Sequence, residues 1–156
     1  MKGAKLLFVT SWVILLVVSS AIVILSLQSL RIAYTGKSDR LTPEYSLAQI
    51  EEQGGNEAVK AFRGRRATAA TFALGYGLLA LIVTWIPYRR GERWAWWALL
   101  GSLGISQLLS LARAVMLVTT VGVSTPATLL AFTLLGLMAG APRMFKQSNS
   151  ALNNRV

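Results

Sequence analysis

Four long apolar runs dominate this chain, at about residues 6–27, 67–86, 94–118 and 121–141. Each run holds about 20 residues and almost no charge, which is the length a helix needs to cross a hydrocarbon layer about 30 Å thick. Backbone polar groups find no water there, so a spanning segment of this length satisfies them within a helix. The sequence therefore predicts an all-α fold, a four-helix transmembrane bundle that forms a single membrane domain over residues 1–156.

The composition narrows the chemistry available to such a bundle. The chain has no cysteine and no histidine, which excludes disulfide exchange, thiolate metal sites and imidazole ligands or bases. No carboxylate lies inside a predicted span, and lysine is confined to the ends and loops. Hydroxyl nucleophiles therefore lack an evident activating base. We expect no enzyme, no metal site and no cofactor.

Charge distribution predicts how the chain is threaded. Four spans place both termini and the turn at 87–93 on one face, where eight basic residues are opposed by Glu92 alone. The other face holds basic and acidic residues together in an outer loop over residues 28–66. The positive-inside rule then places both termini in the cytoplasm. The cluster at 63–66, Arg-Gly-Arg-Arg, argues the other way because it directly precedes the second run.

The outer loop is too long for a bare turn and predicts helical structure of its own. Thr42 and Pro43 are a typical helix start, and Gly54–Gly55 a typical stop. A second helical stretch, capped by Asn56, is expected to run into the second span. The fold is thus a four-helix bundle with a helical extramembrane loop between its first two helices.

Arginine and tryptophan are concentrated around the turn between the second and third runs. The residues are Arg89, Arg90, Arg93, Trp94, Trp96 and Trp97. Amphipathic rings prefer the headgroup layer, and arginine pairs with lipid phosphate there. We expect membrane lipids with anionic headgroups as partners, with a cation-binding aromatic cage as an alternative. The net charge of +10 gathers at the ends of apolar runs, so no nucleic acid is expected.

The third run carries a polar stripe. Spacings of four, four and three place Ser102, Ser106, Ser110 and Arg113 on one helical face, with Gln107 beside it. One interpretation is hydrogen bonding between helices together with an arginine that reaches outward to water. The other is a ligand site, in which Arg113 anchors an anionic headgroup, a carbonyl or a carboxylate.

Small residues predict close helix packing in two runs. Ala69, Ala73 and Gly77 line one side of the second run, and Gly136 with Gly140 form a GxxxG pattern in the fourth. The pattern fits packing inside the bundle and contact with a second membrane protein equally well.

The segment "RRGERWAWW" at 89–97, together with "YTG" at 34–36 and the acidic loop, resembles an uncharacterised group of bacterial four-span inner-membrane proteins, loosely described as DoxX-like. The resemblance covers roughly residues 30–105. Gly64-Arg65-Arg66 stands where that group often has His-Asp-Arg. The resemblance implies a multi-pass protein of the bacterial plasma membrane. It does not indicate an activity.

These observations favour a non-enzymatic integral membrane protein, an accessory or lipid-interacting bundle. One alternative is a carrier or sensor of a small hydrophobic or anionic ligand that uses the Arg113 face. Another is a subunit of a larger membrane protein complex, with the GxxxG helix as its contact.

Overall fold

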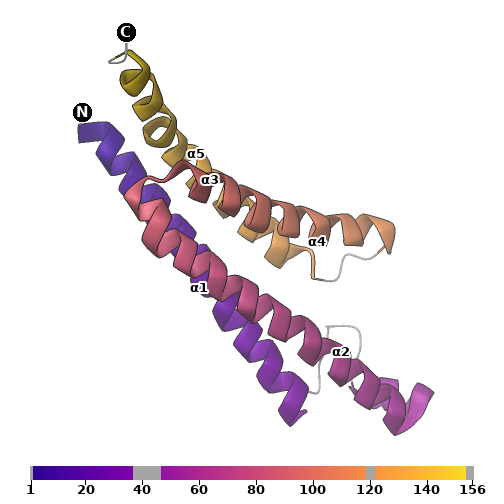
Figure 1. Cartoon of the computed structure of the whole chain (residues 1–156). Coiled ribbons are helices and arrows are strands. Elements are labelled where there is room, and N and C mark those ends of the chain that lie inside the picture. Colours follow the sequence, from indigo (N-terminus) through magenta and orange to yellow (C-terminus); the bar gives the residue numbers. More distant parts are fainter. Residues whose placement is uncertain (1, 37–46, 119–121, 154–156) are drawn as a thin grey trace. The chain divides into compact units, whose positions relative to one another are not determined.

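The computed structural model describes residues 2–36, 47–118 and 122–153, and every element within them is helical (Figure 1). The elements are α1 (Lys2–Thr35), α2 (Leu47–Val83), the π-helical turn η1 (Thr84–Tyr88), α3 (Arg93–Leu99), the π-helical turn η2 (Leu100–Gly104), α4 (Ile105–Met116) and α5 (Ser124–Asn153). Since η1 continues α2 and η2 joins α3 to α4, the described residues form four long helices. The predicted all-α fold is confirmed.

Four helices in the described part of the chain are long and apolar enough to cross a membrane. They cover Leu6–Thr35, Gln49–Tyr88, Arg93–Met116 and Ser124–Phe145. The shortest has 22 residues, about 33 Å at 1.5 Å per residue, which exceeds a hydrocarbon layer of about 30 Å.

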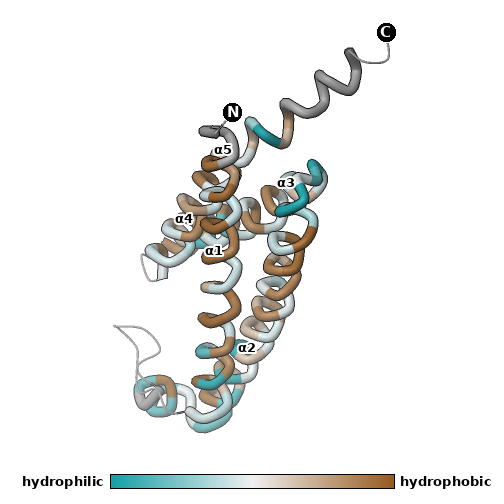
Figure 2. The backbone as a smooth tube through the Cα atoms, turned by 90° about the vertical axis from the view of Figure 1, so that its left-hand side faces the viewer, coloured by the Kyte–Doolittle hydropathy of each residue, from teal (hydrophilic) through white to brown (hydrophobic). Residues whose placement is uncertain are grey.

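Large apolar side chains point outward from all four of these helices. Val17, Phe72, Leu109 and Met138 are 62, 75, 65 and 70% exposed. Hydrophilic residues gather instead at the turn before α3 and in the first part of α2 (Figure 2). Outward apolar faces of this extent are typical of helices surrounded by lipid.

The first two helices extend beyond the predicted spans. α1 continues past Leu27 to Thr35 and ends at Gly36, whose φ of +63° and N–H bond to the Ile32 carbonyl form a glycine C-cap. Hydropathy marks only the apolar part of a helix, whereas the helix itself continues until a residue stops it. α2 begins at Leu47, so the helical outer loop and the second span share one element.

Gly55 interrupts α2, as the predicted glycine stop requires. Its φ of 69° and ψ of −178° are not helical, and helix resumes directly after it. The predicted cap at Thr42 and Pro43 lies outside the described residues.

The chain divides into two compact units. Unit 1 contains the residues up to Ser20 and those from Leu79 onward, and unit 2 contains Ala21–Leu78. Within unit 1, α3, η2 and α4 pack along α5. The first part of α1 buries residues at helical spacing, namely Phe8, Ser11, Leu15 and Val18. The facing side of α5 buries Thr133, Leu137 and Met144.

Unit 2 is an antiparallel pair made by the second part of α1 and the first part of α2. A β-carbon on Gly77 would lie 3.0 Å from Ile22 and 3.1 Å from Val23. The small residue therefore lets the two backbones approach closely. Ala73 is partly buried beside it, whereas Ala69 is exposed and Ala70 takes the buried position.

Candidate functional site

The candidate site is built on the end of α2, where Pro87 lies inside the π-helical turn η1. Proline has no N–H, so a regular helical turn cannot be completed at Pro87. The Trp12 indole donates to the Thr84 carbonyl at 3.1 Å. Gly91, with φ of +82°, then reverses the chain, and its N–H bonds the Tyr88 carbonyl at 2.9 Å. Arg89 and Arg90 thus stand at the end of an apolar helix.

Arg89 is held by two aromatic rings of unit 1. Its guanidinium carbon lies 5.3 Å from the centre of the Trp12 ring and 5.5 Å from that of Trp85. The two rings are 5.4 Å apart and tilted by 43°. Attraction between a guanidinium and each ring fixes the direction of this charge.

Two further arginines of unit 1 lie on rings at the same end. The Arg143 guanidinium carbon lies 4.1 Å from the centre of Phe8, a ring that also stacks on Tyr88. Arg93 lies over Phe145 at 5.8 Å and donates to the Met144 carbonyl at 3.0 Å. It therefore ties the start of α3 to α5.

We call Arg89, Arg90, Arg93 and Arg143, with the rings that they contact, the arginine–aromatic end. Among the described residues, no carboxylate lies within 4.0 Å of Arg89, Arg90 or Arg143; the ion pair that the structure shows is Lys60 with Glu57, in unit 2. The nearby Glu92 accepts a hydrogen bond from the Trp94 indole at 2.6 Å. Positive charge at this end is thus not neutralised by these carboxylates.

The predicted tryptophans divide between surface and interior. Trp94 and Trp97 are 55 and 58% exposed, whereas Trp96 is partly buried and donates to the Leu137 carbonyl. Trp96, Trp97 and Phe145 also contact one another edge to face. This cluster resembles the aromatic cage considered from sequence, but the cation on its Phe145 ring is the chain's own Arg93.

A buried polar contact lies beneath the arginine–aromatic end. The Ser11 hydroxyl donates to the Gly136 carbonyl at 2.6 Å and shares a 2.5 Å hydrogen bond with the Tyr88 hydroxyl. A β-carbon on Gly140 would collide with the Tyr88 hydroxyl, and one on Gly136 would lie 2.9 Å from Leu15. The GxxxG pattern is therefore used for packing inside unit 1.

The residues of the predicted polar stripe are divided between η2 and α4. Ser102 lies in η2, where the π-helical turn changes the angular register of the residues before α4. Gln107 is buried, Ser106 and Ser110 are partly buried, and Arg113 is exposed. A β-carbon on Gly122 would lie 3.7 Å from the Arg113 guanidinium, so this arginine reaches toward the start of α5.

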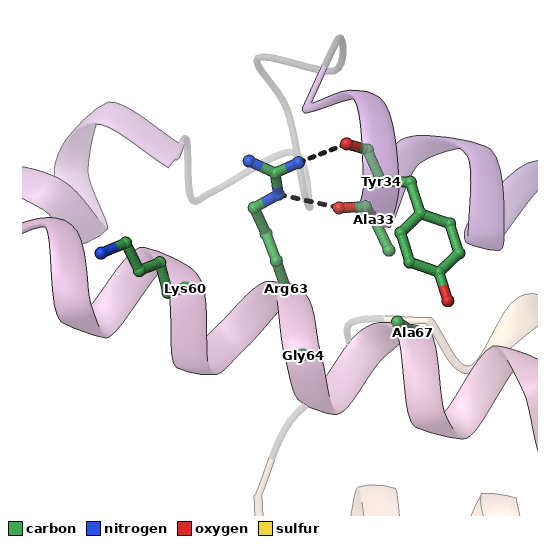
Figure 3. Close-up of a pocket in the computed structure, with 6 residues that line it drawn as sticks. All are labelled: Ala33, Tyr34, Lys60, Arg63, Gly64 and Ala67. Carbon is green, nitrogen blue, oxygen red and sulfur yellow. Dashed lines mark hydrogen bonds between the residues drawn. The ribbon is translucent and has the colours of Figure 1, made fainter.

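Two arginines of the outer loop have structural roles in unit 2. Arg63 donates from Nε to the Ala33 carbonyl at 2.8 Å and from Nη2 to the Tyr34 carbonyl at 2.6 Å (Figure 3). These are carbonyls of the last turn of α1, which have no partner inside their own helix. Arg66 donates to the Ser29 hydroxyl at 3.2 Å.

The chemistry within reach of these groups is recognition of anions. In the described ranges, no group of three or more Asp, Glu, His or Cys residues could hold a metal ion. A guanidinium offers five N–H donors in a plane, and a ring beneath it leaves the donors at its edge open to an oxyanion.

Sequence reasoning missed Trp12 and Ser11, and it did not predict the contact of Arg143 with the Phe8 ring. Trp12 and Ser11 are the signal that was available, since an indole and a hydroxyl interrupt the first apolar run. Their hydrogen-bond partners lie on other helices. The sequence of one apolar run does not predict which helices pack together.

Comparison with known proteins does not assign the chain to a family. No protein-family model matches the chain, and no curated protein or solved structure shows significant similarity to it.

Proposed function

We propose that this chain is a non-enzymatic protein of the bacterial plasma membrane whose arginine–aromatic end binds anionic lipid headgroups. One observation carries the proposal. Arg89, Arg90 and Arg143 are exposed at the end of apolar helices and have no carboxylate partner among the described residues, while two of them are held on aromatic rings.

The physical basis is the charge of the lipid surface. An anionic leaflet attracts each nearby arginine by about 1 kcal/mol, so three exposed arginines supply about 3 kcal/mol. Tryptophan and tyrosine rings favour the headgroup layer, and Trp85 and Trp94 lie at this end with 47 and 55% of their surface exposed. The rings would set the depth of the helices, and the guanidiniums would meet the phosphates.

The same charge favours a cytoplasmic position for both termini. The cytoplasmic leaflet carries the anionic lipid, and the positive-inside rule places arginine there. Arg63 and Arg66 oppose this orientation in the sequence, but their contacts with α1 give them a structural reason to be present. The bacterial assignment rests on the resemblance of residues 89–97 to four-span inner-membrane proteins.

Lipid analysis of the purified protein tests the proposal. The wild type is extracted from bacterial membranes in a mild detergent, and the phospholipids that co-purify are quantified by class. We expect enrichment of anionic over zwitterionic lipid relative to the membrane. We expect the enrichment to fall when Arg89, Arg90 and Arg143 are all changed to Gln.

A second triple variant supplies the matched control. Arg31, Lys60 and Arg65 are exposed residues whose change to Gln removes the same charge from unit 2. This control should retain the enrichment. Equal loss in both variants, or no enrichment in the wild type, would refute the proposed function.

A further inference from the structure

A groove opens beside Arg89 on the surface of unit 1. It has a volume of about 360 Å³ and is lined by Trp85, Ile86, Arg89 and Arg90. This volume is within the range of about 300–1,000 Å³ that is typical of small-ligand sites. Two of the four lining residues are cationic and two are apolar, so the groove suits an amphiphile.

The guanidinium of Arg89 is pre-positioned at this groove. Two neighbouring rings in contact with it limit its rotamers, which lowers the entropy lost when it binds a ligand. Its guanidinium interacts with these two rings, and contact with a ring face leaves the N–H donors of the guanidinium edge available. Arg90, also exposed, supplies a second cation at the groove.

A stripe of exposed apolar residues leads along α2 to these two arginines. Leu79, Ile82 and Ile86 follow at spacings of three and four and are 60, 53 and 44% exposed. The spacing of three keeps Leu79 and Ile82 on one face of α2, and Ile86, in the π-helical turn η1, lines the groove itself. A phosphate at the arginines therefore has an apolar track beside it, which a free phosphate would not use and an acyl chain would.

We infer that the groove is a discrete site for one anionic phospholipid, with its phosphate on Arg89 and Arg90 and an acyl chain along Leu79, Ile82 and Ile86. The inference rests on the proposed function and assigns one stoichiometric site within it. A zwitterionic lipid is a poorer ligand, because the same two arginines repel its positively charged ammonium group.

Thermal unfolding in a zwitterionic detergent tests this site. Short-chain phosphatidylglycerol, short-chain phosphatidylcholine and water-soluble glycerol phosphate are titrated separately, since a ligand that binds the folded state raises Tm with concentration. We expect saturable stabilisation by phosphatidylglycerol alone. Equal stabilisation by glycerol phosphate would overturn a lipid as the occupant, and equal stabilisation by phosphatidylcholine would overturn the requirement for negative charge.

Two pairs of variants locate the effect. Arg89→Gln should weaken the apparent affinity for phosphatidylglycerol about tenfold, the lower end expected for a lost hydrogen bond to a charged group. The matched control Arg65→Gln, in unit 2, should leave it unchanged. Trp85→Leu, which removes one ring from Arg89, should weaken it as well, whereas Phe72→Leu, at an exposed aromatic position of unit 2, should not.

The outcomes separate this site from the proposed function. If Arg89→Gln binds phosphatidylglycerol as the wild type does while the triple arginine variant loses anionic lipid, the discrete site is refuted and the proposed function stands. If the wild type shows no preference for anionic lipid in either experiment, both are refuted.

Discussion

Individual residues set how closely α5 can approach its neighbours. Gly140 lies where a single methyl group would meet both the Tyr88 hydroxyl and the Ser11 hydroxyl. These two groups are also hydrogen-bonded to each other, so neither can move away without loss. The small residue thus permits a polar contact in the interior of unit 1.

We therefore expect Gly140→Ala to destabilise the protein by about 1–3 kcal/mol, the usual cost of overpacking a filled interior. The measurement is thermal unfolding in detergent. Gly75→Ala is the matched control, because a β-carbon there would meet nothing within 4 Å. Removing a helical glycine in open space should stabilise by about 0.5–1 kcal/mol. Equal effects of the two substitutions would contradict the packing described for Gly140.

The spacing of Gly136 and Gly140 predicted the need for close packing but not the partner. GxxxG specifies a flat helix surface, and any helix that fits can cover it. Here Leu15 and Tyr88 do so, from two different helices. The Arg89 site was only partly predictable for the same reason: its arginines stand out in the turn, whereas Trp12 comes from the first helix.

At the scale of elements, the ends of helices need partners from elsewhere in the chain. The last carbonyls of α1 accept hydrogen bonds from Arg63 of α2, and Gly36 closes the turn. This arginine therefore couples the end of one helix to the side of the next within unit 2.

We expect Arg63→Leu to loosen the end of α1, with a loss of about 1.5–3 kcal/mol for the charged hydrogen bonds removed. Hydrogen exchange of the amides at 33–36 measures this loosening. Arg63→Lys should be intermediate, because an ammonium group lacks the planar fork that meets two carbonyls. Arg65→Leu, at an exposed neighbouring position, should leave these amides protected. If Arg63→Leu leaves these amides as protected as in the wild type, the hydrogen bonds of Arg63 do not stabilise the end of α1.

Within the described residues, the four long helices were predictable and their limits were not. Apolar length specifies a spanning helix, but the helix itself continues through residues 28–35 until Gly36 ends it. A register change is harder to foresee. The π-helical turn at Leu100–Gly104 contains Ser102, and it changes the angular spacing on which the predicted stripe was based, because a π-helical turn holds more residues than an α-helical one.

At the scale of the whole molecule, the proposed orientation follows from charge. Because the chain has no cysteine, single-cysteine variants can be labelled without background. Ile50→Cys should react with an impermeant maleimide applied to intact cells, and Ser150→Cys should react only after the membrane is opened. Reaction of position 150 alone in intact cells would reverse the orientation.

The central claim is that the arginine–aromatic end binds an anionic lipid surface. Its most direct test is the unfolding temperature of the wild type in nanodiscs of phosphatidylcholine alone and in nanodiscs that also contain phosphatidylglycerol. We predict a higher Tm in the anionic discs, and a difference that shrinks as salt screens the charges. Equal Tm values in the two kinds of disc at low salt would contradict the claim.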